Sequence, residues 1–186
     1  MKKNICVFGG SVSGKEKANA NLANLVGQTI AENNFDLVFG GGENGMMGLV
    51  ASSSIRYGAK ATGIIPDFFI KEDNINTIFP NKFNTKLIIT KTMHERKQLM
   101  YNKSDAFLIL PGGIGTLDEC FEVLTWCQLS LIKNKNIGIL NFSGYWDPLM
   151  ALIKNVISEG FMSPENLNYF EEIKDIELLK IFLNNI

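Results

Sequence analysis

A segment in the second half of the chain combines a glycine turn with two carboxylates. Residues 106–110 form an apolar run, and residues 111–115 contain a proline and three glycines before a helical pattern that starts near Thr116. Such a turn attracts phosphate, because its backbone approaches the ligand closely and the helix start carries a partial positive charge. Asp118 and Glu119 follow at once, where carboxylates repel phosphate. The pattern therefore indicates chemistry on a phosphorylated molecule rather than simple anion binding.

A basic pair follows another predicted strand, at residues 87–90. Four side chains there share one helical face by their i, i+3, i+4 and i+7 spacing: Met93, Arg96, Lys97 and Met100. Arginine binds phosphate or carboxylate through a planar fork, and lysine adds a point charge. Either this pair reaches the same site as the glycine turn, or it belongs to a solvated face on which Glu95 pairs with its neighbours. His94 is the single histidine, so no zinc site is expected and no role is assigned to it.

Two more glycine-rich turns, at residues 9–14 and 40–48, follow the apolar runs 4–8 and 36–39. One such turn is typical of any tight connection between a strand and a helix, but three at the same edge of a sheet indicate a nucleotide pocket. The chain contains no Gly-x-x-x-x-Gly-Lys-Ser/Thr motif, which disfavours a P-loop triphosphatase. The first turn also lacks the Gly-x-Gly-x-x-Gly spacing, which disfavours a dinucleotide-dependent dehydrogenase.

Strand-like runs alternate with helical patterns along the whole chain. Strands are expected at residues 4–8, 36–39, 61–65, 87–90, 106–110 and 137–141, and helices at 15–33, 45–57, 93–103, 116–131, 145–159 and 176–184. Runs that are apolar throughout are buried on both faces, which requires helices on either side of a parallel sheet. We therefore predict a single α/β domain over residues 1–186, a Rossmann-like, doubly wound parallel sheet. Residues 66–86 are expected to be irregular and to form a lid or binding surface.

Composition limits the partners. The 186 residues are 46% apolar and 20% charged with a formal net charge of −1, so no nucleic acid is expected as a partner. No apolar run reaches the roughly 18 residues of a membrane helix, and no signal peptide is expected before the first strand. Three cysteines lack paired spacing and are expected to be small core residues in a reduced, cytoplasmic protein: Cys6, Cys120 and Cys127.

Three motifs, at residues 92–97, 111–119 and 40–48, closely resemble those of the Lonely Guy family. Lesser matches lie at residues 125–129, 141–149 and 160–161. Members of this family are cytokinin riboside 5′-monophosphate phosphoribohydrolases, and bacterial members often accept AMP. The resemblance implies hydrolysis of the N-glycosidic bond of adenosine 5′-monophosphates, with or without an N6 substituent, to free base and ribose 5-phosphate. It further implies a homodimer with its active site near the subunit interface, and no metal or other cofactor is expected.

The resemblance also implies roles for individual residues. Arg96 and Glu119 match catalytic positions. The expected substrate-binding residues, including two from the earlier glycine turns, are Ser11, Gly42, Lys97, Gly112, Gly113, Ile114, Gly115, Thr116, Leu117, Asp118 and Thr125. Asp118 occupies a position where many members have glutamate, so the carboxylate here is carried on a side chain that is shorter by one methylene group. Val12 replaces a serine usual in the first turn, which loosens a phosphate contact.

The residues support the same reaction when they are considered directly. Loss of the base builds positive charge on the ribose, and a carboxylate near the anomeric carbon stabilises that charge and orients or deprotonates a water molecule. We assign this role to Glu119, with the 5′-phosphate held in the turn that precedes it. Arg96 is expected to bind the phosphate or to position Glu119, and an ion pair between them would keep the carboxylate charged near neutral pH.

Two other classes of protein remain open. A non-catalytic carrier of a nucleotide or of the molybdenum cofactor needs the glycine turns but has no use for Arg96 and Glu119 together. A pyridoxal-dependent amino-acid decarboxylase requires a lysine Schiff base, for which Lys97 is the one lysine expected near the site. Three phenylalanines either form an apolar pocket for a substituent on the base or belong to the core: Phe68, Phe69 and Phe79.

Overall fold

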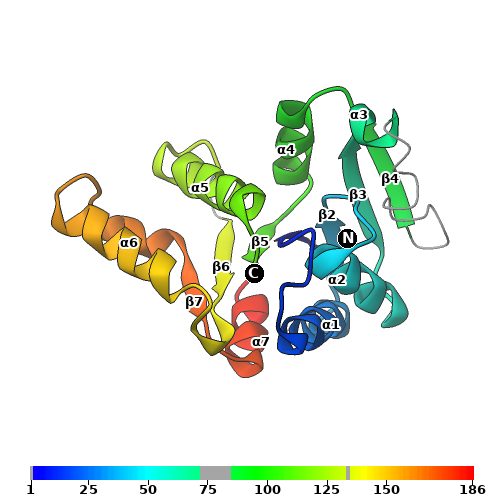
Figure 1. Cartoon of the computed structure of the whole chain (residues 1–186), viewed down its shortest axis with the longest axis horizontal. Coiled ribbons are helices and arrows are strands. Elements are labelled where there is room, and N and C mark those ends of the chain that lie inside the picture. The colour runs from blue at the N-terminus through cyan, green and yellow to red at the C-terminus, as the bar shows by residue number, and fades with distance from the viewer. Residues whose placement is uncertain (1, 72–84, 133–134) are drawn as a thin grey trace.

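The computed structural model describes residues 2–71, 85–132 and 135–186 (Figure 1). Within these residues, parallel strands form one seven-stranded sheet in the order β4-β3-β2-β1-β5-β6-β7. The strands are β1 (Asn4–Phe8), β2 (Asp36–Phe39), β3 (Ala61–Pro66), β4 (Thr85–Thr90), β5 (Ala106–Ile109), β6 (Asn136–Leu140) and β7 (Glu171–Ile173). The chain order reverses between β1 and β5, so a crevice is expected at the carboxyl ends of these two central strands.

Helices cover both faces of the sheet, as Figure 1 shows. One face carries α1 (Lys17–Glu32), α2 (Gly45–Arg56) and α7 (Ile176–Asn184), and the other carries α4 (Met93–Asn102), α5 (Ile114–Gln128) and α6 (Asp147–Ser158). Successive side chains of a strand point to opposite faces. In β1, Ile5 and Val7 accordingly pack in the core with α1, α2 and α7, whereas Cys6 and Phe8 pack in the core with α4, α5 and α6. The prediction of a doubly wound parallel sheet is confirmed.

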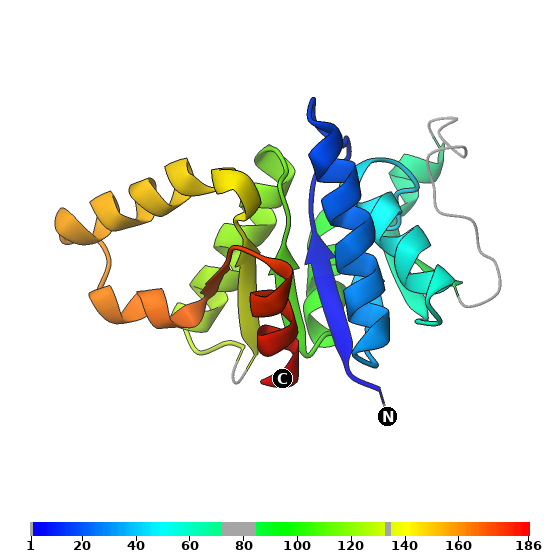
Figure 2. The ribbon, with the colours of Figure 1, turned by 90° about the horizontal axis from the view of Figure 1, so that it is seen from below.

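One region departs from this layered arrangement. In Figure 2, α6 and the 3-10 helix η3 (Pro164–Tyr169) extend sideways from the body of the sheet. A second 3-10 helix, η2 (Phe142–Gly144), lies between β6 and α6. No helix in the part of the chain that the structure describes has the length and apolar character needed to cross a bilayer.

The expected strands and helices are present, with ends that shift by up to three residues. Strand β7 was not predicted, because its sequence Glu-Glu-Ile is short and polar and becomes a strand only by pairing with β6. Within the stretch expected to be irregular, α3 (Asp67–Lys71) forms a short helix and residues 85–86 belong to β4. Pro66 is the last residue of β3, and residues 72–84, including Phe79, lie outside the described residues. Cys6 and Cys120 are buried as expected, but Cys127 is only half-buried.

Candidate active site

The first glycine turn is hydrogen-bonded to both of the others. The backbone N–H of Gly10 donates to the carbonyl oxygen of Pro111, before α5, over 3.0 Å. The backbone N–H of Met46, in the first turn of α2, donates to the carbonyl oxygen of Gly10 over 2.9 Å. Strands β1, β2 and β5 are neighbours in the sheet, so their carboxyl ends bring these three turns together. The prediction that three glycine turns share one sheet edge is confirmed.

The turn before α5 can close only around a glycine at position 112. A Cβ on Gly112 would lie 2.1 Å from Oγ1 of Thr116 and 2.8 Å from the backbone nitrogen of Gly10. Helix α5 then begins at Ile114 with Gly113 as its N-cap, and no side chain caps it. The N–H groups of its first turn therefore lack a capping side chain, which is the arrangement in which a helix start binds an anion.

The start of α4 is fixed by side-chain capping. Oγ1 of Thr92 accepts a hydrogen bond from the backbone N–H of Glu95 over 3.1 Å, and Oε2 of Glu95 accepts one from the backbone N–H of Lys91 over 2.8 Å. This pattern is close to a capping box, in which residues at the N-cap and N3 satisfy the free donors of the helix start. The cap sets the rotation of α4 so that Arg96 and Lys97, in its first turn and a half, both reach side chains of α5.

Arg96 and Glu119 form a buried ion pair. Nη1 of Arg96 lies 3.1 Å from Oε1 of Glu119, and Nε of Arg96 donates to the carbonyl oxygen of Ile64 over 3.1 Å. Only 8% of Arg96 and 6% of Glu119 is exposed. A Cβ on Gly40, at the end of β2, would lie 2.3 Å from Nη2 of Arg96. The guanidinium is thus held between β2, β3 and α5 in one position.

Burial dominates the protonation of Glu119. Loss of hydration raises the pKa of Glu119 to about 7, and the adjacent guanidinium of Arg96 offsets this rise only in part. The nearby negative charge of Asp118 raises the pKa further, whereas Lys97 lowers it. Arg96 favours the charged form of Glu119, in the direction expected of the ion pair, while desolvation favours the neutral form. A carboxyl that titrates near neutral pH is suited to general acid–base catalysis.

A second cluster of charges lies beside this pair. Nζ of Lys97 is 3.1 Å from Oδ2 of Asp118 and 2.9 Å from Oε2 of Glu122, which also accepts a hydrogen bond from the hydroxyl of Tyr101. Partial burial lowers the pKa of Lys97, but the hydrogen bonds to Glu122 and Asp118 outweigh this effect and raise it above its ordinary value. Lys97 is therefore a charged ammonium held between two carboxylates.

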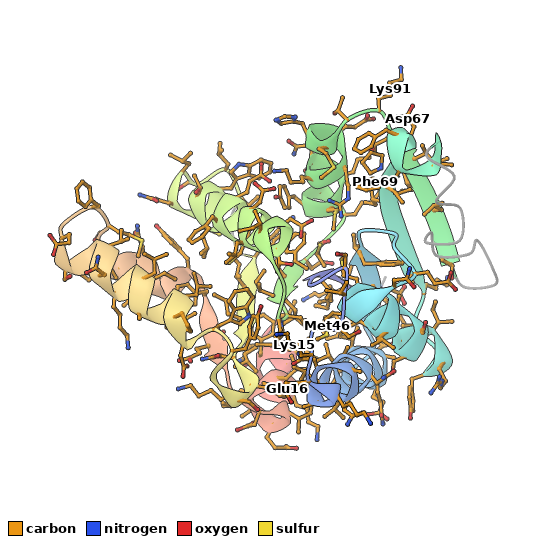
Figure 3. The ribbon with its side chains drawn as sticks, in the orientation of Figure 1. Lys15, Glu16, Met46, Asp67, Phe69 and Lys91 are labelled. Carbon is orange, nitrogen blue, oxygen red and sulfur yellow. The ribbon has the colours of Figure 1, made fainter. Side chains whose placement is uncertain are left out.

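Two cavities adjoin at Ser11, which lines both of them. The first has a volume of about 300 Å³ and is also lined by Arg96 and Gly42, with an apolar wall formed by Met47, Ile65, Phe69 and Met93. In Figure 3, Phe69 extends from α3 toward α4, and Met46 lies at the start of α2. The second cavity, of about 280 Å³, is lined by Gly10, Gly112, Gly113 and Tyr145. The glycines of the second cavity let backbone N–H groups approach an anion, and the first cavity has an apolar wall, so the two together suit a ligand with an anionic end and a flat apolar end.

Sequence comparisons identify relatives with a known reaction. A family model described as "Possible lysine decarboxylase" matches residues 47–180. A cytokinin riboside 5′-monophosphate phosphoribohydrolase of Arabidopsis thaliana is 40% identical over 166 residues, which cover 87% of this chain and 72% of that relative. The protein of the same name from Rhodococcoides fascians is 38% identical over 178 residues, covering 94% of this chain and 86% of that relative. The chain belongs to the Lonely Guy family.

Solved structures show how widely the fold of this Lonely Guy family member occurs. The molybdenum cofactor binding protein of Rippkaea orientalis superposes with a TM-score of 0.70 over 99% of this chain and 96% of its own, at 19% identity. The molybdenum cofactor carrier protein of Chlamydomonas reinhardtii gives a TM-score of 0.67 over 99% and 97% of the two chains, at 18% identity. At these identities the likeness concerns the fold alone.

Five of the residues expected in the site of this Lonely Guy protein line the two cavities: Ser11, Gly42, Arg96, Gly112 and Gly113. Glu119 joins them through its ion pair with Arg96. Thr116 is buried against Gly112, and Gly115 and Leu117 belong to the same first turn of α5. Lys97 and Asp118 contact each other, and neither residue lines one of the two cavities.

Two expected residues point away from these cavities. Ile114 is 81% exposed at the start of α5. Thr125 is exposed near the end of that helix, donates its hydroxyl hydrogen to the carbonyl oxygen of Phe121 over 2.7 Å, and lines a separate cavity of about 90 Å³ that η3 also lines. Within one chain of this Lonely Guy protein, α5 therefore carries Thr125 away from Arg96 and Glu119.

Three residues that contact the candidate site were not singled out from the sequence: Gly40, Glu122 and Tyr145. Gly40 was included only as the first residue of its glycine turn, although it is the position that makes room for Arg96. Glu122 lies four residues after Asp118, so the two carboxylates share one face of α5 and can bind the same cation, Lys97. Tyr145 lies within the family match at residues 141–149, but nothing in its neighbourhood in sequence indicated the glycine turn that it contacts.

Proposed function

We propose that this chain hydrolyses the N-glycosidic bond of adenosine 5′-monophosphate and its N6-substituted forms. The products are the free base and ribose 5-phosphate. The observation that carries the proposal is the buried pair of Arg96 and Glu119, which lies at the carboxyl edge of the sheet beside the glycine turn of α5. Membership of the phosphoribohydrolase family supports the same reaction. We further propose that residues 1–186 act as one domain, because β1 and β7 belong to one sheet.

In this mechanism the 5′-phosphate binds at the start of α5. The backbone N–H groups of Gly113 and the residues after it face the anion, and the helix dipole adds to the attraction. Glu119 lies five residues beyond Ile114, roughly 7.5 Å along the helix axis at 1.5 Å per residue. That offset is comparable with the span from a 5′-phosphate to the anomeric carbon, so the bound phosphate fixes the ribose against Glu119.

Glu119 acts on the anomeric carbon and on water. As the bond from the base nitrogen to the anomeric carbon breaks, the ionised carboxylate stabilises the positive charge that develops on the ribose. Water oxygen bonds to that carbon, and Glu119 accepts the proton released from the water. The electrons of the broken bond leave with the base, which takes up one proton. Arg96 holds Glu119 in place and keeps part of its population ionised near neutral pH.

The apolar cavity is the proposed site of the base. Met47, Ile65, Phe69 and Met93 offer apolar surface to a flat ring and to an alkyl chain on it. Phe68 stacks on Phe69 with ring centroids 4.7 Å apart, and both rings are partly exposed. These two phenylalanines are therefore available to a ligand rather than being closed into the core.

The charge state of Lys97 argues against a decarboxylase. A lysine that forms a Schiff base has its pKa lowered so that the neutral amine is present. The two carboxylates beside Lys97 instead raise its pKa. A carrier protein, in turn, has no need for a carboxyl that titrates near neutral pH in contact with a fixed guanidinium. Hydrolysis uses both features.

We also propose that the protein is a homodimer that acts in the cytoplasm. Three side chains on α5 share one exposed face at i, i+7 and i+11: Ile114, Phe121 and Thr125. A second copy packed on this face would cover its apolar residues and bring Thr125 close to the partner's site. Analytical ultracentrifugation tests this: wild-type protein should sediment as a dimer, and Phe121→Glu should shift it to monomer.

The proposal that the protein acts in the cytoplasm rests on its cysteines. Cys6 and Cys120 are buried free thiols, which favour a reducing compartment.

The proposed reaction is tested directly with purified protein. AMP and N6-isopentenyl-AMP are incubated separately with the protein, and free base and ribose 5-phosphate are measured by chromatography. Equimolar release of both products supports the proposal. Binding of nucleotide without release of base in the wild-type protein would contradict it and favour a carrier.

A further inference from the structure

Tyr145 reaches the glycine turn of α5 from a different part of the chain. Its hydroxyl donates a hydrogen bond to the carbonyl oxygen of Gly112 over 2.8 Å, and its side chain lines the 280 Å³ cavity together with Gly10 and Gly113. Tyr145 lies between β6 and α6, directly after η2. The contact therefore joins the region after β6 to the turn after β5, two neighbouring strands.

The backbone that carries Tyr145 is held by a buried asparagine. Asn141 is 3% exposed, and its Nδ2 donates to Oδ1 of Asp147 over 2.8 Å and to Oε1 of Glu172 over 2.6 Å. Its Oδ1 accepts a hydrogen bond from the backbone N–H of Trp146 over 2.6 Å. The side chain of Asn141 thus ties both ends of this segment to each other and to β7.

The same segment contains a strained residue. Ser143 has a φ of 56°, in the left-handed region that non-glycine residues rarely adopt. Such strain persists where surrounding contacts fix the conformation, and it is frequent at functional sites. Here the indole ring of Trp146 is buried and packs edge-on against the ring of Tyr145, with centroids 4.8 Å apart. The segment is therefore rigid at its base and presents Tyr145 at the rim of the cavity.

Tyr145 binds the peptide group between Gly112 and Gly113. The carbonyl oxygens on either side of it accept from backbone N–H groups: that of Pro111 from Gly10 over 3.0 Å, and that of Gly113 from Leu117 over 3.0 Å. The carbonyl of Gly112 is bound by the Tyr145 hydroxyl. Because the C=O and N–H of a trans peptide point in opposite directions, this bond also sets the direction of the N–H of Gly113. Glycines on both sides offer little resistance to rotation of that peptide.

We propose that Tyr145 is a positioning residue for phosphate binding. Its hydroxyl holds the Gly112 carbonyl so that the N–H of Gly113 stays directed at the phosphate of the ligand. This inference rests on the proposed function for the nature of the ligand, and it adds a residue whose action is confined to the phosphate. Since 46% of Tyr145 is exposed, loss of its hydroxyl leaves the core and the ring contact with Trp146 intact.

The test compares Tyr145→Phe with Tyr57→Phe. Tyr57 is also 46% exposed but follows α2, at the opposite end of the sheet, so it is a matched control. Isothermal titration calorimetry measures the binding of ribose 5-phosphate and of adenosine to each protein, and thermal unfolding verifies that all three are folded. We expect Tyr145→Phe to weaken ribose 5-phosphate binding about fivefold, as for loss of one neutral hydrogen bond, with adenosine binding and the melting temperature unchanged. Tyr57→Phe should change neither affinity.

Two results would overturn the inference. Unchanged binding of ribose 5-phosphate by Tyr145→Phe would show that the hydroxyl does not position the turn. Equal weakening of both ligands, or equal effects of the two substitutions, would show a general structural role. Wild-type protein that binds neither ribose 5-phosphate nor adenosine would instead contradict the proposed function, so the two failures are distinguishable.

Discussion

Two ion-pair clusters join α4 to α5, and they are built from adjacent residues. Arg96 and Glu119 form one of them, and Lys97 and Asp118 belong to the other. Arg96 and Glu119 have side chains that are 9% and 8% exposed, whereas 56% of the Asp118 side chain is exposed. The charges are of the same kinds, but the Glu119 carboxyl is buried, and this burial raises its pKa to about 7. Burial therefore distinguishes Glu119, which is able to transfer protons near neutral pH, from its mostly exposed neighbour Asp118.

Replacement of the two acids should have very different effects on turnover. Glu119→Gln keeps the size of the side chain and the hydrogen-bond acceptor but removes the charge and the proton acceptor. We expect it to retain nucleotide binding and to lower kcat by ~10² or more, the scale of acid–base and electrostatic contributions. Steady-state kinetics with AMP measures this.

The matched control for that substitution is Asp118→Asn. Because the mostly exposed Asp118 is expected to bind substrate rather than to act on the reacting atoms, its loss should raise KM, and we expect kcat to stay within about fivefold of wild type. Near-normal turnover in Glu119→Gln would remove Glu119 from the mechanism. Equal losses in the two variants would contradict the distinction between the clusters.

Removal of the two cations should separate their contributions to stability. Arg96→Ala leaves the Glu119 carboxyl buried without its partner, and breaking a buried pair in this way costs about 3 kcal/mol. Lys97→Ala removes the partner of two carboxylates that are 56% and 22% exposed, so water replaces the ammonium more readily and we expect a smaller loss, about 1–2 kcal/mol. Urea unfolding of both variants gives the two free energies of unfolding. We also expect Arg96→Ala to weaken catalysis, because the pKa of Glu119 rises further without the guanidinium. Similar losses of stability in the two variants would show that burial does not set the Arg96–Glu119 pair apart from the Lys97 cluster, and unchanged kinetics in Arg96→Ala would remove Arg96 from the mechanism.

The activity of the enzyme should depend on pH through Glu119. If the ionised carboxylate is the active form, kcat/KM rises with pH with a midpoint near 7, where the pKa of Glu119 lies. Asp118→Asn removes a negative charge that raises this pKa and should move the midpoint to lower pH. A profile that falls through neutral pH would instead make Glu119 a general acid.

The same titration should affect stability. Folding raises the pKa of Glu119 above its ordinary value of 4.5 to about 7, so between these values the native state binds more protons than the unfolded chain. The contribution of Glu119 to the free energy of unfolding is therefore largest below pH 4.5 and is lost as the pH rises through 7. Urea unfolding across this range should show a shallower pH dependence in Glu119→Gln than in wild type.

The fixed position of Arg96 can be disturbed without touching its charge. In Gly40→Ala the new methyl group would lie 2.3 Å from Nη2 of Arg96, and we expect a loss of about 1–3 kcal/mol in the free energy of unfolding from overpacking. The control is Gly115→Ala, where a Cβ meets nothing within 4 Å, and alanine in a helix is favoured over glycine. Urea unfolding should therefore show Gly115→Ala at or above wild-type stability. Equal stability of Gly40→Ala and wild type would mean that the guanidinium moves aside freely.

Much of the fold was predictable because local pattern and tertiary environment agree. Apolar runs such as residues 5–8 and 106–110 have no polar side to expose, which is typical of central parallel strands. The strand β7 could not be predicted in this way, since Glu171 and Glu172 are not strand-forming residues and depend on the edge of β6 for their pairing. Helix α3 is only five residues long, too short for its periodicity to be recognised.

The chemistry of the site was only partly predictable. The types and spacing of Arg96 and Glu119, together with the glycine turns, are enough by themselves to indicate phosphate and ribose chemistry. Three features depended on the tertiary structure: the burial that raises the pKa of Glu119, the room that Gly40 makes for the guanidinium, and the contact of Tyr145 with Gly112. Hydration and contacts between distant residues are set by how the layers pack, and the order of residues along the chain does not encode either one locally.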